Sequence, residues 1–266
     1  MKPASWTLQR QKSNNKDVSK GFISEIYCTW QGEGIALGER QVFVRMAGCP
    51  LRCVWCDTPE SLGTRGHPAL DPPEIARRIR RAAVPAARTV SITGGEPLAQ
   101  VDCLESLLPL LKAEGWRVYL ETAGVHAEAL KRVIDRCDVV SMDIKLPSAV
   151  GRSFWREHAD FLRIGGEKTF VKIVLTDNSS DEEVQRACEL MAAHSRDIPL
   201  VLQPVTPIPV LSSRWPSRAA GTRGSRPPMP VRPPEPMAVL RWFDLAKRWL
   251  SDVRIIVQLH PLWGVP

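Results

Sequence analysis

The stretch Gly48-Cys49-Pro50-Leu51-Arg52-Cys53-Val54-Trp55-Cys56-Asp57-Thr58 is the feature around which the chain is organised. It holds three cysteines within eight residues, at the spacing C-x3-C-x2-C. A loop this short can direct three thiolates toward one point, and three thiolates suit an iron–sulfur cluster or zinc. Three protein ligands leave one iron of a four-iron cluster open, which raises the question of what binds there.

Zinc is the main alternative for these thiols. It needs a fourth ligand, and the nearest candidate, His67, follows eleven residues after Cys56. Structural zinc sites usually come from two separated pairs of ligands, a pattern that this stretch lacks. Three buried thiols without metal are a further alternative, but such thiols rarely lie so close together on one loop. We therefore predict an iron–sulfur cluster, because the set has three soft ligands.

The basic charge of the chain is concentrated in two segments. Residues 1–20 and 207–236 carry a net charge of +4 each, which leaves −1 of the total of +7 for the rest. A nearly neutral body argues against a nucleic-acid surface built into the fold. We interpret residues 1–20 as a disordered basic leader. Residues 207–236, with nine of the 23 prolines and five arginines, are expected to form an inserted Pro/Arg-rich loop.

Cysteine usage and hydropathy predict a cytoplasmic location. The seven cysteines are an odd number, and the first residues lack the apolar core of a secretory signal. No apolar run approaches the roughly 18 residues that a membrane span requires. Four cysteines outside the loop receive no role: Cys28, Cys103, Cys137 and Cys188.

Short apolar strands alternate with helical segments along most of the chain. The expected strands are 22–27, 41–46, 89–93, 117–121, 138–143, 169–175, 199–203 and 253–257, and the expected helices are 72–83, 101–114, 126–135, 180–194 and 236–250. This rhythm predicts an α/β fold with a parallel sheet, open or closed into a barrel. Residues 21–206 would form its core, and residues 237–266 would complete the same domain with a helix, a strand and a tail.

Polar residues recur at the C-terminal ends of the predicted strands. They are Arg45, Thr93, Glu121, Asp143 and Gln203. In parallel α/β folds this edge of the sheet carries the active site, so we expect these side chains to share one site.

The cysteine spacing after an early strand, with Gly94-Gly95-Glu96-Pro97 at the end of a later one, resembles the radical S-adenosylmethionine (SAM) superfamily. The resemblance implies a partial, open TIM-like barrel of parallel strands with helices outside. It also implies a [4Fe–4S] cluster on Cys49, Cys53 and Cys56, with SAM on the open iron as the source of a 5′-deoxyadenosyl radical. Gly94, Gly95 and Glu96 would contact the methionyl group of SAM.

A narrower resemblance, over residues 22–206 and 253–266, is to the 7-carboxy-7-deazaguanine synthase family. It implies a pterin substrate held by Trp30, Gln31, Gly32, Glu33, Arg45, Thr93, His260 and the terminal carboxylate of Pro266. Further SAM contacts implied by the resemblance are Ser141, Asp143, Lys145, Gln203, Pro204, Val205 and Thr206. Thr58 would bind Mg²⁺. The loop 207–236 is not part of the family's pattern.

Structural roles remain open for several of these residues. Arg45 could form a surface ion pair, and Thr58 could cap a helix. Ser141 and Gln203 could serve as buried hydrogen-bonding groups. His260 alone would more often be structural, but its six-residue distance from Pro266 matches the family.

The resemblance implies conversion of 6-carboxy-5,6,7,8-tetrahydropterin to 7-carboxy-7-deazaguanine with loss of ammonia, in queuosine biosynthesis. This is a carbon–nitrogen lyase reaction. It also implies a homodimer and an electron donor such as flavodoxin or ferredoxin. A radical SAM activating enzyme for a glycyl-radical partner is the alternative, although it would not require the Gln-Gly-Glu-Gly loop, Arg45 or a proline terminus. An alternative of another class is a zinc-stabilised binding module without catalytic activity.

Overall fold

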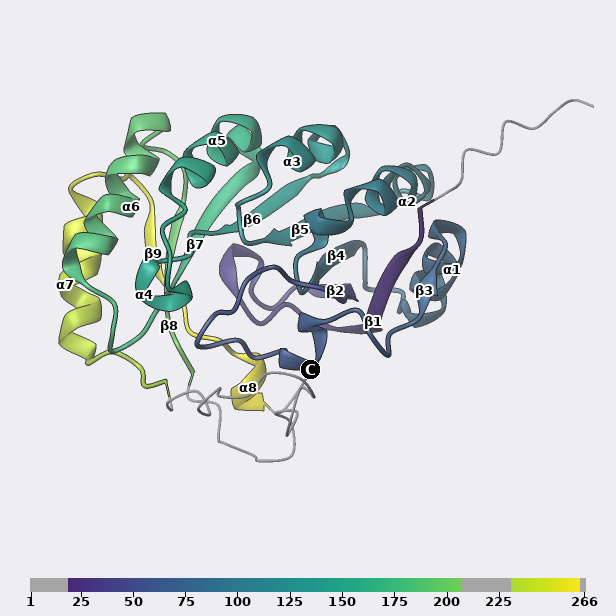
Figure 1. The fold of residues 1–266 in the computed structure, drawn as a ribbon, viewed down its shortest axis with the longest axis horizontal. Coiled ribbons are helices and arrows are strands. Elements are labelled where there is room, and N and C mark those ends of the chain that lie inside the picture. Colours follow the sequence, from purple (N-terminus) through teal and green to yellow (C-terminus); the bar gives the residue numbers. More distant parts are fainter. Residues whose placement is uncertain (1–18, 207–230, 264–266) are drawn as a thin grey trace, which may run out of the picture.

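The computed structural model describes residues 19–206 and 231–263 (Figure 1). The predicted leader, apart from its last two residues, lies outside these described residues. So do Pro266 and most of the predicted Pro/Arg-rich loop. None of the helices in the described ranges is long and apolar enough to cross a membrane.

Nine strands form one sheet in the order β3-β1-β2-β4-β5-β6-β7-β8-β9. Their bounds are β1 Gly21–Trp30, β2 Arg40–Met46, β3 Ala69–Leu70, β4 Thr89–Gly94, β5 Arg117–Thr122, β6 Val139–Asp143, β7 Thr169–Leu175, β8 Leu200–Pro204 and β9 Val253–Ile255. All pairs from β2 to β9 are parallel. The edge strands β3 and β9 are not neighbours, so the curved sheet is open within the described residues. The prediction of a partial, open barrel is confirmed.

The first two strands depart from the parallel pattern. β1 pairs with β2 antiparallel, from Ile23 opposite Met46 to Trp30 opposite Arg40. A short connection can join antiparallel neighbours, whereas parallel ones need a crossover. The nine residues between β1 and β2 leave no room for a crossover helix.

All helices except the four-residue α4 and α8 lie along the outer face of the sheet (Figure 1). Their bounds are α1 Pro72–Ala82, α2 Val101–Ala113, α3 Ala127–Val133, α4 Pro147–Val150, α5 Trp155–Gly165, α6 Asp181–His194, α7 Pro236–Lys247 and α8 His260–Trp263. Five short 3-10 turns, η1 Gly34–Ala36, η2 Pro59–Leu62, η3 Pro97–Gln100, η4 Ile134–Arg136 and η5 Gly166–Lys168, lie among the described connections. The predicted helices and strands are all present, and their ends differ by at most three residues.

Local capping explains where α1 and α6 begin. The Asp71 side chain accepts a hydrogen bond from the Glu74 N–H at the start of α1, and a proline occupies the first turn. Ser180 and Glu183 form a reciprocal capping box at the start of α6.

The helix α5 was not predicted from the sequence. This helix provides the crossover between β6 and β7, and it buries His158, Phe161, Leu162 and Gly165 against the core. Their i, i+3, i+4 and i+7 spacing is the signal that could have revealed it.

Side-chain alternation along the strands separates the core from the site. On β5, Val118 and Leu120 join the main core beneath the helices, whereas Tyr119 and Glu121 face the opposite side. Tyr119, Phe170 and Val201 form a small apolar cluster on that inner face. The cluster fills the interior below the C-terminal strand ends, so polar residues two positions further on can line a cavity.

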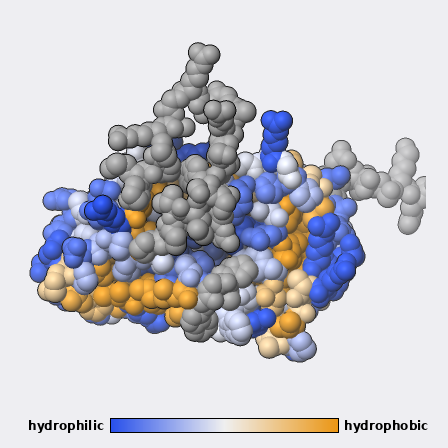
Figure 2. All heavy atoms as spheres, turned by 90° about the horizontal axis from the view of Figure 1, so that it is seen from below, coloured by the Kyte–Doolittle hydropathy of each residue, from blue (hydrophilic) through white to orange (hydrophobic). Residues whose placement is uncertain are grey.

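The exposed face in Figure 2 carries hydrophobic side chains in separate groups among hydrophilic ones. Met237 and Leu262 are among the most exposed large hydrophobic residues that are described. Scattered residues of this kind are normal for a protein surface. These exposed side chains do not mark an interface between two copies of the chain, so the homodimer stays a prediction.

His158 joins two of the strand ends. Its Nδ1–H donates to the Gly124 carbonyl at 3.0 Å, and its Nε2 accepts from the Lys145 backbone N–H at 3.1 Å. This second bond requires a neutral ring. Burial lowers the pKa of His158 to about 4. The neutral ring thereby ties the loop after β5 to the segment after β6.

We predict that His158 makes folding sensitive to mild acid. Its folded-state pKa lies below the unfolded value of about 6.5, so its contribution is complete above that pH. As the pH falls to about 4, a contribution of about 3 kcal/mol is lost. Urea unfolding measured from pH 7 to pH 4.5 should show a flatter pH dependence in His158→Gln than in the wild type. Parallel profiles for the two proteins would contradict this prediction.

Candidate active site

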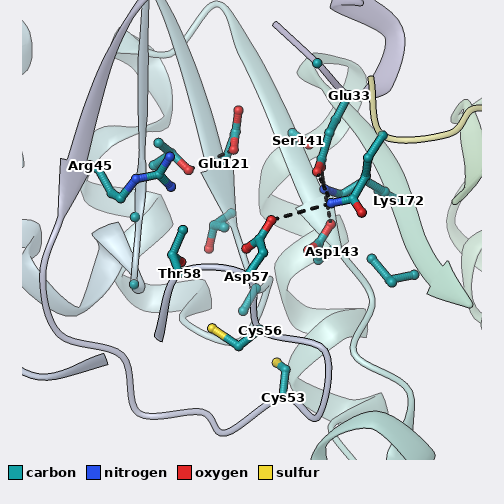
Figure 3. Close-up of a pocket in the computed structure, with 18 of the residues that line it drawn as sticks. Glu33, Arg45, Cys53, Cys56, Asp57, Thr58, Glu121, Ser141, Asp143 and Lys172 are labelled. Carbon is teal, nitrogen blue, oxygen red and sulfur yellow. Dashed lines mark hydrogen bonds and ion pairs between the residues drawn. The ribbon is translucent and has the colours of Figure 1, made fainter. Parts of the chain in front are cut away.

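One cavity at the C-terminal edge of the sheet collects most of the predicted site residues (Figure 3). The predicted residues that line it are Trp30, Gln31, Gly32, Glu33, Arg45, Cys49, Cys53, Cys56, Thr58, Thr93, Gly94, Gly95, Ser141, Asp143, Lys145, Gln203 and His260. The residues that do not line it are Glu96, Pro204, Val205 and Thr206. Pro266 lies outside the described residues. The five polar strand-end residues therefore share one cavity.

The three loop cysteines are free thiols that lie partly buried beside the same cavity. Burial raises the pKa of each of them, and that of Cys56 reaches about 11. Such thiols are protonated at neutral pH, and a metal centre must displace these protons to bind.

A zinc ion bound by the three thiols would require a fourth protein ligand. Among the described residues, only Glu33, Asp57 and His260 form a group of potential ligands whose atoms all lie within 4.8 Å of one another. His67, the proposed fourth zinc ligand, contacts the Glu60 carbonyl and does not line the cavity. His67 is therefore not placed to complete a zinc site with the three thiols.

Gly94 and Gly95 press against the start of the cysteine loop. A Cβ on Gly94 would lie 2.1 Å from the Met46 carbonyl oxygen, and one on Gly95 would lie 2.4 Å from the Gly48 carbonyl oxygen. The Gly95 N–H donates to Met46 at 2.8 Å, and the Glu96 N–H donates to Gly48 at 2.9 Å. The two glycines therefore set the position of the cysteine loop.

The Glu96 side chain has a structural role in this arrangement. Its fully buried carboxylate accepts hydrogen bonds from Thr122 Oγ1 at 2.8 Å, the Ala123 N–H at 2.7 Å and the Leu98 N–H at 3.0 Å. It ties the turn after β4 to the end of β5. Any contact from Glu96 to a ligand would have to come from its backbone.

Several buried polar atoms at the cavity have no hydrogen-bond partner among the described residues. They are Trp55 Nε1, Asp143 Oδ1 and both amide atoms of Gln203. Gln203 is fully buried. Because buried polar groups are nearly always paired, these atoms indicate that a polar ligand binds here.

Charged side chains link the two sides of the cavity (Figure 3). Lys172 forms an ion pair with Glu33, and its Nζ lies 3.5 Å from Asp143 Oδ1. Lys145 Nζ donates to Asp143 Oδ2 at 2.6 Å. Burial opposes the charge on Lys172, but Asp143 and Glu33 hold its pKa well above the ordinary value. Lys172 is therefore a cation in the folded protein.

His260 approaches the cavity from the C-terminal segment. Its Nε2 lies 3.8 Å from Asp57 Oδ2. Burial works against protonation, but Asp57 and Glu33 raise the pKa of His260. This shift stabilises the interaction of His260 with the two carboxylates, and the ligand atoms of Glu33, Asp57 and His260 all lie within 4.8 Å of one another. Gly32 has no room for a side chain here, since a Cβ would lie 2.7 Å from His260 Nδ1.

Arg45 combines an ion pair with a place at the cavity. Its Nε donates to Glu25 at 2.6 Å, and its Nη2 donates to the Tyr27 hydroxyl at 2.5 Å. The predicted alternative of an ion pair is thus present. The side chain is only 14% exposed, and it lines the cavity beside Thr93.

Thr58 precedes η2 but does not cap it with its side chain. Its hydroxyl and its backbone hydrogen-bond to the Cys56 thiol, and both bonds favour the thiolate. Thr58 also lines the cavity, so its hydroxyl is accessible to a ligand.

Comparison with known proteins identifies the family. The radical SAM superfamily matches residues 43–191, which is more than half of the chain. The 7-carboxy-7-deazaguanine synthase of Geobacter sulfurreducens is 38% identical over 262 residues, covering 91% of this chain and 96% of that protein. The chain belongs to the 7-carboxy-7-deazaguanine synthase family of radical SAM enzymes.

Other comparisons agree with this assignment. The 7-carboxy-7-deazaguanine synthase of Thermococcus kodakarensis is 33% identical, covering 73% of this chain and 87% of that protein. The crystal structure of QueE from Escherichia coli covers 94% of this chain and 100% of that one, with a TM-score of 0.61. At 22% sequence identity this structural match supports the fold alone.

Radical SAM enzymes bind a [4Fe–4S] cluster and SAM, and the cavity fits both groups. Three thiols border it with no fourth cysteine among its lining residues. The amide of Gln203, which has no hydrogen-bond partner among the described residues, can serve the polar groups of SAM. These are the described residues that could hold the two cofactors.

The sequence analysis gave no site role to several residues that line this cavity. They are Tyr27, Trp55, Asp57, Lys172 and Gln258, whereas Glu121 had been expected at the shared site without a specific role. Glu121 accepts hydrogen bonds from Gln31 at 2.8 Å and Thr93 at 2.8 Å, although the sequence suggested only its place at a strand end. Lys172 could have been singled out from the sequence, because a lysine inside the apolar strand 169–175 indicates a buried charge that needs a partner. Nothing local distinguishes Gln258.

We predict that Gln203→Leu stabilises the apoprotein but weakens the binding of SAM. Removing two unpaired buried groups should raise the free energy of unfolding of the apoprotein by about 1 kcal/mol. It should also weaken SAM binding to the clustered protein roughly tenfold. Urea unfolding and anaerobic calorimetry measure the two effects, with Gln185→Leu on the exposed side of α6 as the matched control. Unchanged SAM affinity would remove Gln203 from the SAM site.

Proposed function

We propose that this chain converts 6-carboxy-5,6,7,8-tetrahydropterin to 7-carboxy-7-deazaguanine with loss of ammonia, as a carbon–nitrogen lyase of queuosine biosynthesis. The observation that carries the proposal is the pair of opposite charges at one cavity. Arg45 and Glu33 lie on different sides of it, with Cys53 and Cys56 between them at its edge (Figure 3). A carboxypterin offers matching groups, namely a carboxylate and a row of N–H donors.

Arg45 would bind the substrate carboxylate. Its contacts with Glu25 and Tyr27 use Nε and one Nη2 bond, which leaves further guanidinium donors for a carboxylate. These two contacts hold the side chain in place before substrate binds, so less conformational entropy is lost on binding.

Glu33 would accept from the N–H groups of the pyrimidine ring. Gln258 Nε2 donates to its Oε1 at 2.7 Å, and Lys172 pairs with its Oε2. Burial raises the pKa of Glu33, but Lys172 reverses this and holds it below the ordinary value. An ionised, oriented carboxylate is suited to paired N–H donors. Gln31, Thr93 and His260 line the same region and would complete the substrate contacts, together with Trp30 and Gly32.

The cofactors have separate protein ligands in this proposal. Cys49, Cys53 and Cys56 would hold the cluster. Gly94, Gly95, Ser141, Asp143, Lys145 and Gln203 would hold SAM, with the Glu96 backbone and residues 204–206 behind them. When bound, the reduced cluster and SAM would together supply the radical that removes a hydrogen atom from the pterin. The chain itself orients both reactants and limits access of water to the buried part of the cavity.

Thr58 would bind Mg²⁺ through its hydroxyl, since Mg²⁺ commonly takes few protein ligands and completes its shell with water or substrate oxygens. Its place beside both Cys56 and the cavity supports this role. The electron donor, such as flavodoxin or ferredoxin, the homodimer, the cytoplasmic location and the terminal contact of Pro266 are further parts of the proposal.

The glycyl-radical activase alternative explains less of the cavity. It provides no reason for Glu33, Gln258 and His260 to meet on one side of a cavity that Arg45 lines on the other. A small anionic substrate with N–H donors would explain this arrangement, because it can contact the cation and the carboxylate at once.

The decisive assay uses clustered, reduced protein with SAM, Mg²⁺ and 6-carboxy-5,6,7,8-tetrahydropterin. We expect 7-carboxy-7-deazaguanine by mass spectrometry. Arg45→Met should lower kcat/KM by roughly 30- to 160-fold, as expected for about 2 to 3 kcal/mol of lost charge-assisted hydrogen bonding. Arg80→Met, on the exposed side of α1, is the control. Protein that cleaves SAM but forms no deazaguanine would refute the proposed reaction.

A further inference from the structure

Lys172 occupies an unusual place for a lysine. It lies in β7, where all seven residues are buried, and its side chain is only 11% exposed. A buried ammonium is costly unless opposite charges and hydrogen bonds compensate it. The contacts of Lys172 therefore explain why the chain places a lysine there.

Those contacts reach both halves of the proposed site. On one side Lys172 pairs with Glu33 of the loop after β1, which would bind the pterin. On the other its Nζ lies 3.5 Å from Asp143 Oδ1 at the end of β6, in the segment that would bind SAM. The register of the sheet enforces the second contact, because Asp143 and Lys172 are directly paired across β6 and β7.

The chain of charges continues beyond Asp143. Asp143 Oδ2 accepts from Lys145 at 2.6 Å, and the Lys145 ammonium lies 4.3 Å from the centre of the Trp55 ring in the cysteine loop. Glu33, Lys172, Asp143 and Lys145 alternate in charge, and their side chains are each less than one-fifth exposed. The four charges cancel.

Removing the Lys172 charge would disturb both ends of this chain. Glu33 and Asp143 would then be two buried carboxylates without the cation between them. Asp57 adds a third carboxylate, with an oxygen within 4.8 Å of Glu33. Like charges in a poorly solvated site repel strongly or take up a proton. In either case the Glu33 carboxylate is no longer both ionised and held in one orientation. Asp143 likewise loses one of the two ammonium groups that hold it in place.

We propose that Lys172 is a positioning residue shared by the pterin and SAM subsites, orienting Glu33 toward the pterin and Asp143 toward SAM. This inference rests on the proposed function. Lys172 acts through the two carboxylates, whereas Glu33 and Asp143 each act in one subsite. One buried cation thereby aligns two ligands that have to meet for hydrogen transfer.

The test compares three variants of the clustered protein: Lys172→Met, Glu33→Gln and Asp143→Asn. Binding of SAM and of 6-carboxy-5,6,7,8-tetrahydropterin is measured separately by anaerobic calorimetry. Lys172→Met should raise both dissociation constants roughly tenfold or more. Glu33→Gln should weaken pterin binding alone, and Asp143→Asn should weaken SAM binding alone. Lys131→Met, on the exposed side of α3, should change neither constant.

A general loss of structure is separated from positioning by chemical rescue. Lys172→Ala is measured with and without propylammonium, using propanol as the uncharged control. Recovery of both affinities with propylammonium alone supports the proposal. No recovery overturns it, as does a Lys172→Met variant that loses affinity for only one ligand or for neither.

The proposed function is judged independently by turnover of the pterin in the wild type. A wild type that binds SAM but not the pterin would overturn the proposed function and, with it, the shared role of Lys172. A wild type that makes 7-carboxy-7-deazaguanine, with Lys172→Met retaining both affinities, would overturn the inference about Lys172 alone.

Discussion

The site depends on a close contact between two backbone segments. The ends of β2 and β4 approach so closely that neither Gly94 nor Gly95 has space for a Cβ. Two backbone hydrogen bonds from this turn hold Met46 and Gly48, and the cysteine loop begins at that point. The fully buried Glu96 then anchors the same turn to the end of β5. The glycines therefore position the loop that carries the thiols, whatever contacts they also make with a ligand.

Charge balance is the second organising feature of the cavity. Two carboxylates and two ammonium groups alternate across it, and burial makes each of them dependent on its neighbours. The compensation is nearly complete among the protein groups, whereas the amide of Gln203 and one oxygen of Asp143 lack hydrogen-bond partners among the described residues. Such a site is prepared for a polar ligand, because binding would satisfy atoms that the fold leaves unpaired.

Local sequence was sufficient to predict most of the architecture. Apolar runs marked the strands, and the structure adds the capping residues that fix where α1 and α6 begin. The crossover helix α5 was missed because its buried face includes a histidine and a glycine among only two large apolar residues. The antiparallel pairing of β1 followed from connection length, which strand patterns alone do not express.

The sequence by itself indicated the chemistry of the metal centre, since the three cysteines lie on one short loop and their spacing is a local feature. It also determined that polar residues would gather at one edge of a parallel sheet. Only the tertiary structure decided how they meet. Lys172 and Glu33 are 139 positions apart, and Gln258 and Glu33 are 225 apart. The physical reason is that ion pairs and buried hydrogen bonds depend on distance in space, which is set by strand order and register rather than by neighbouring residues.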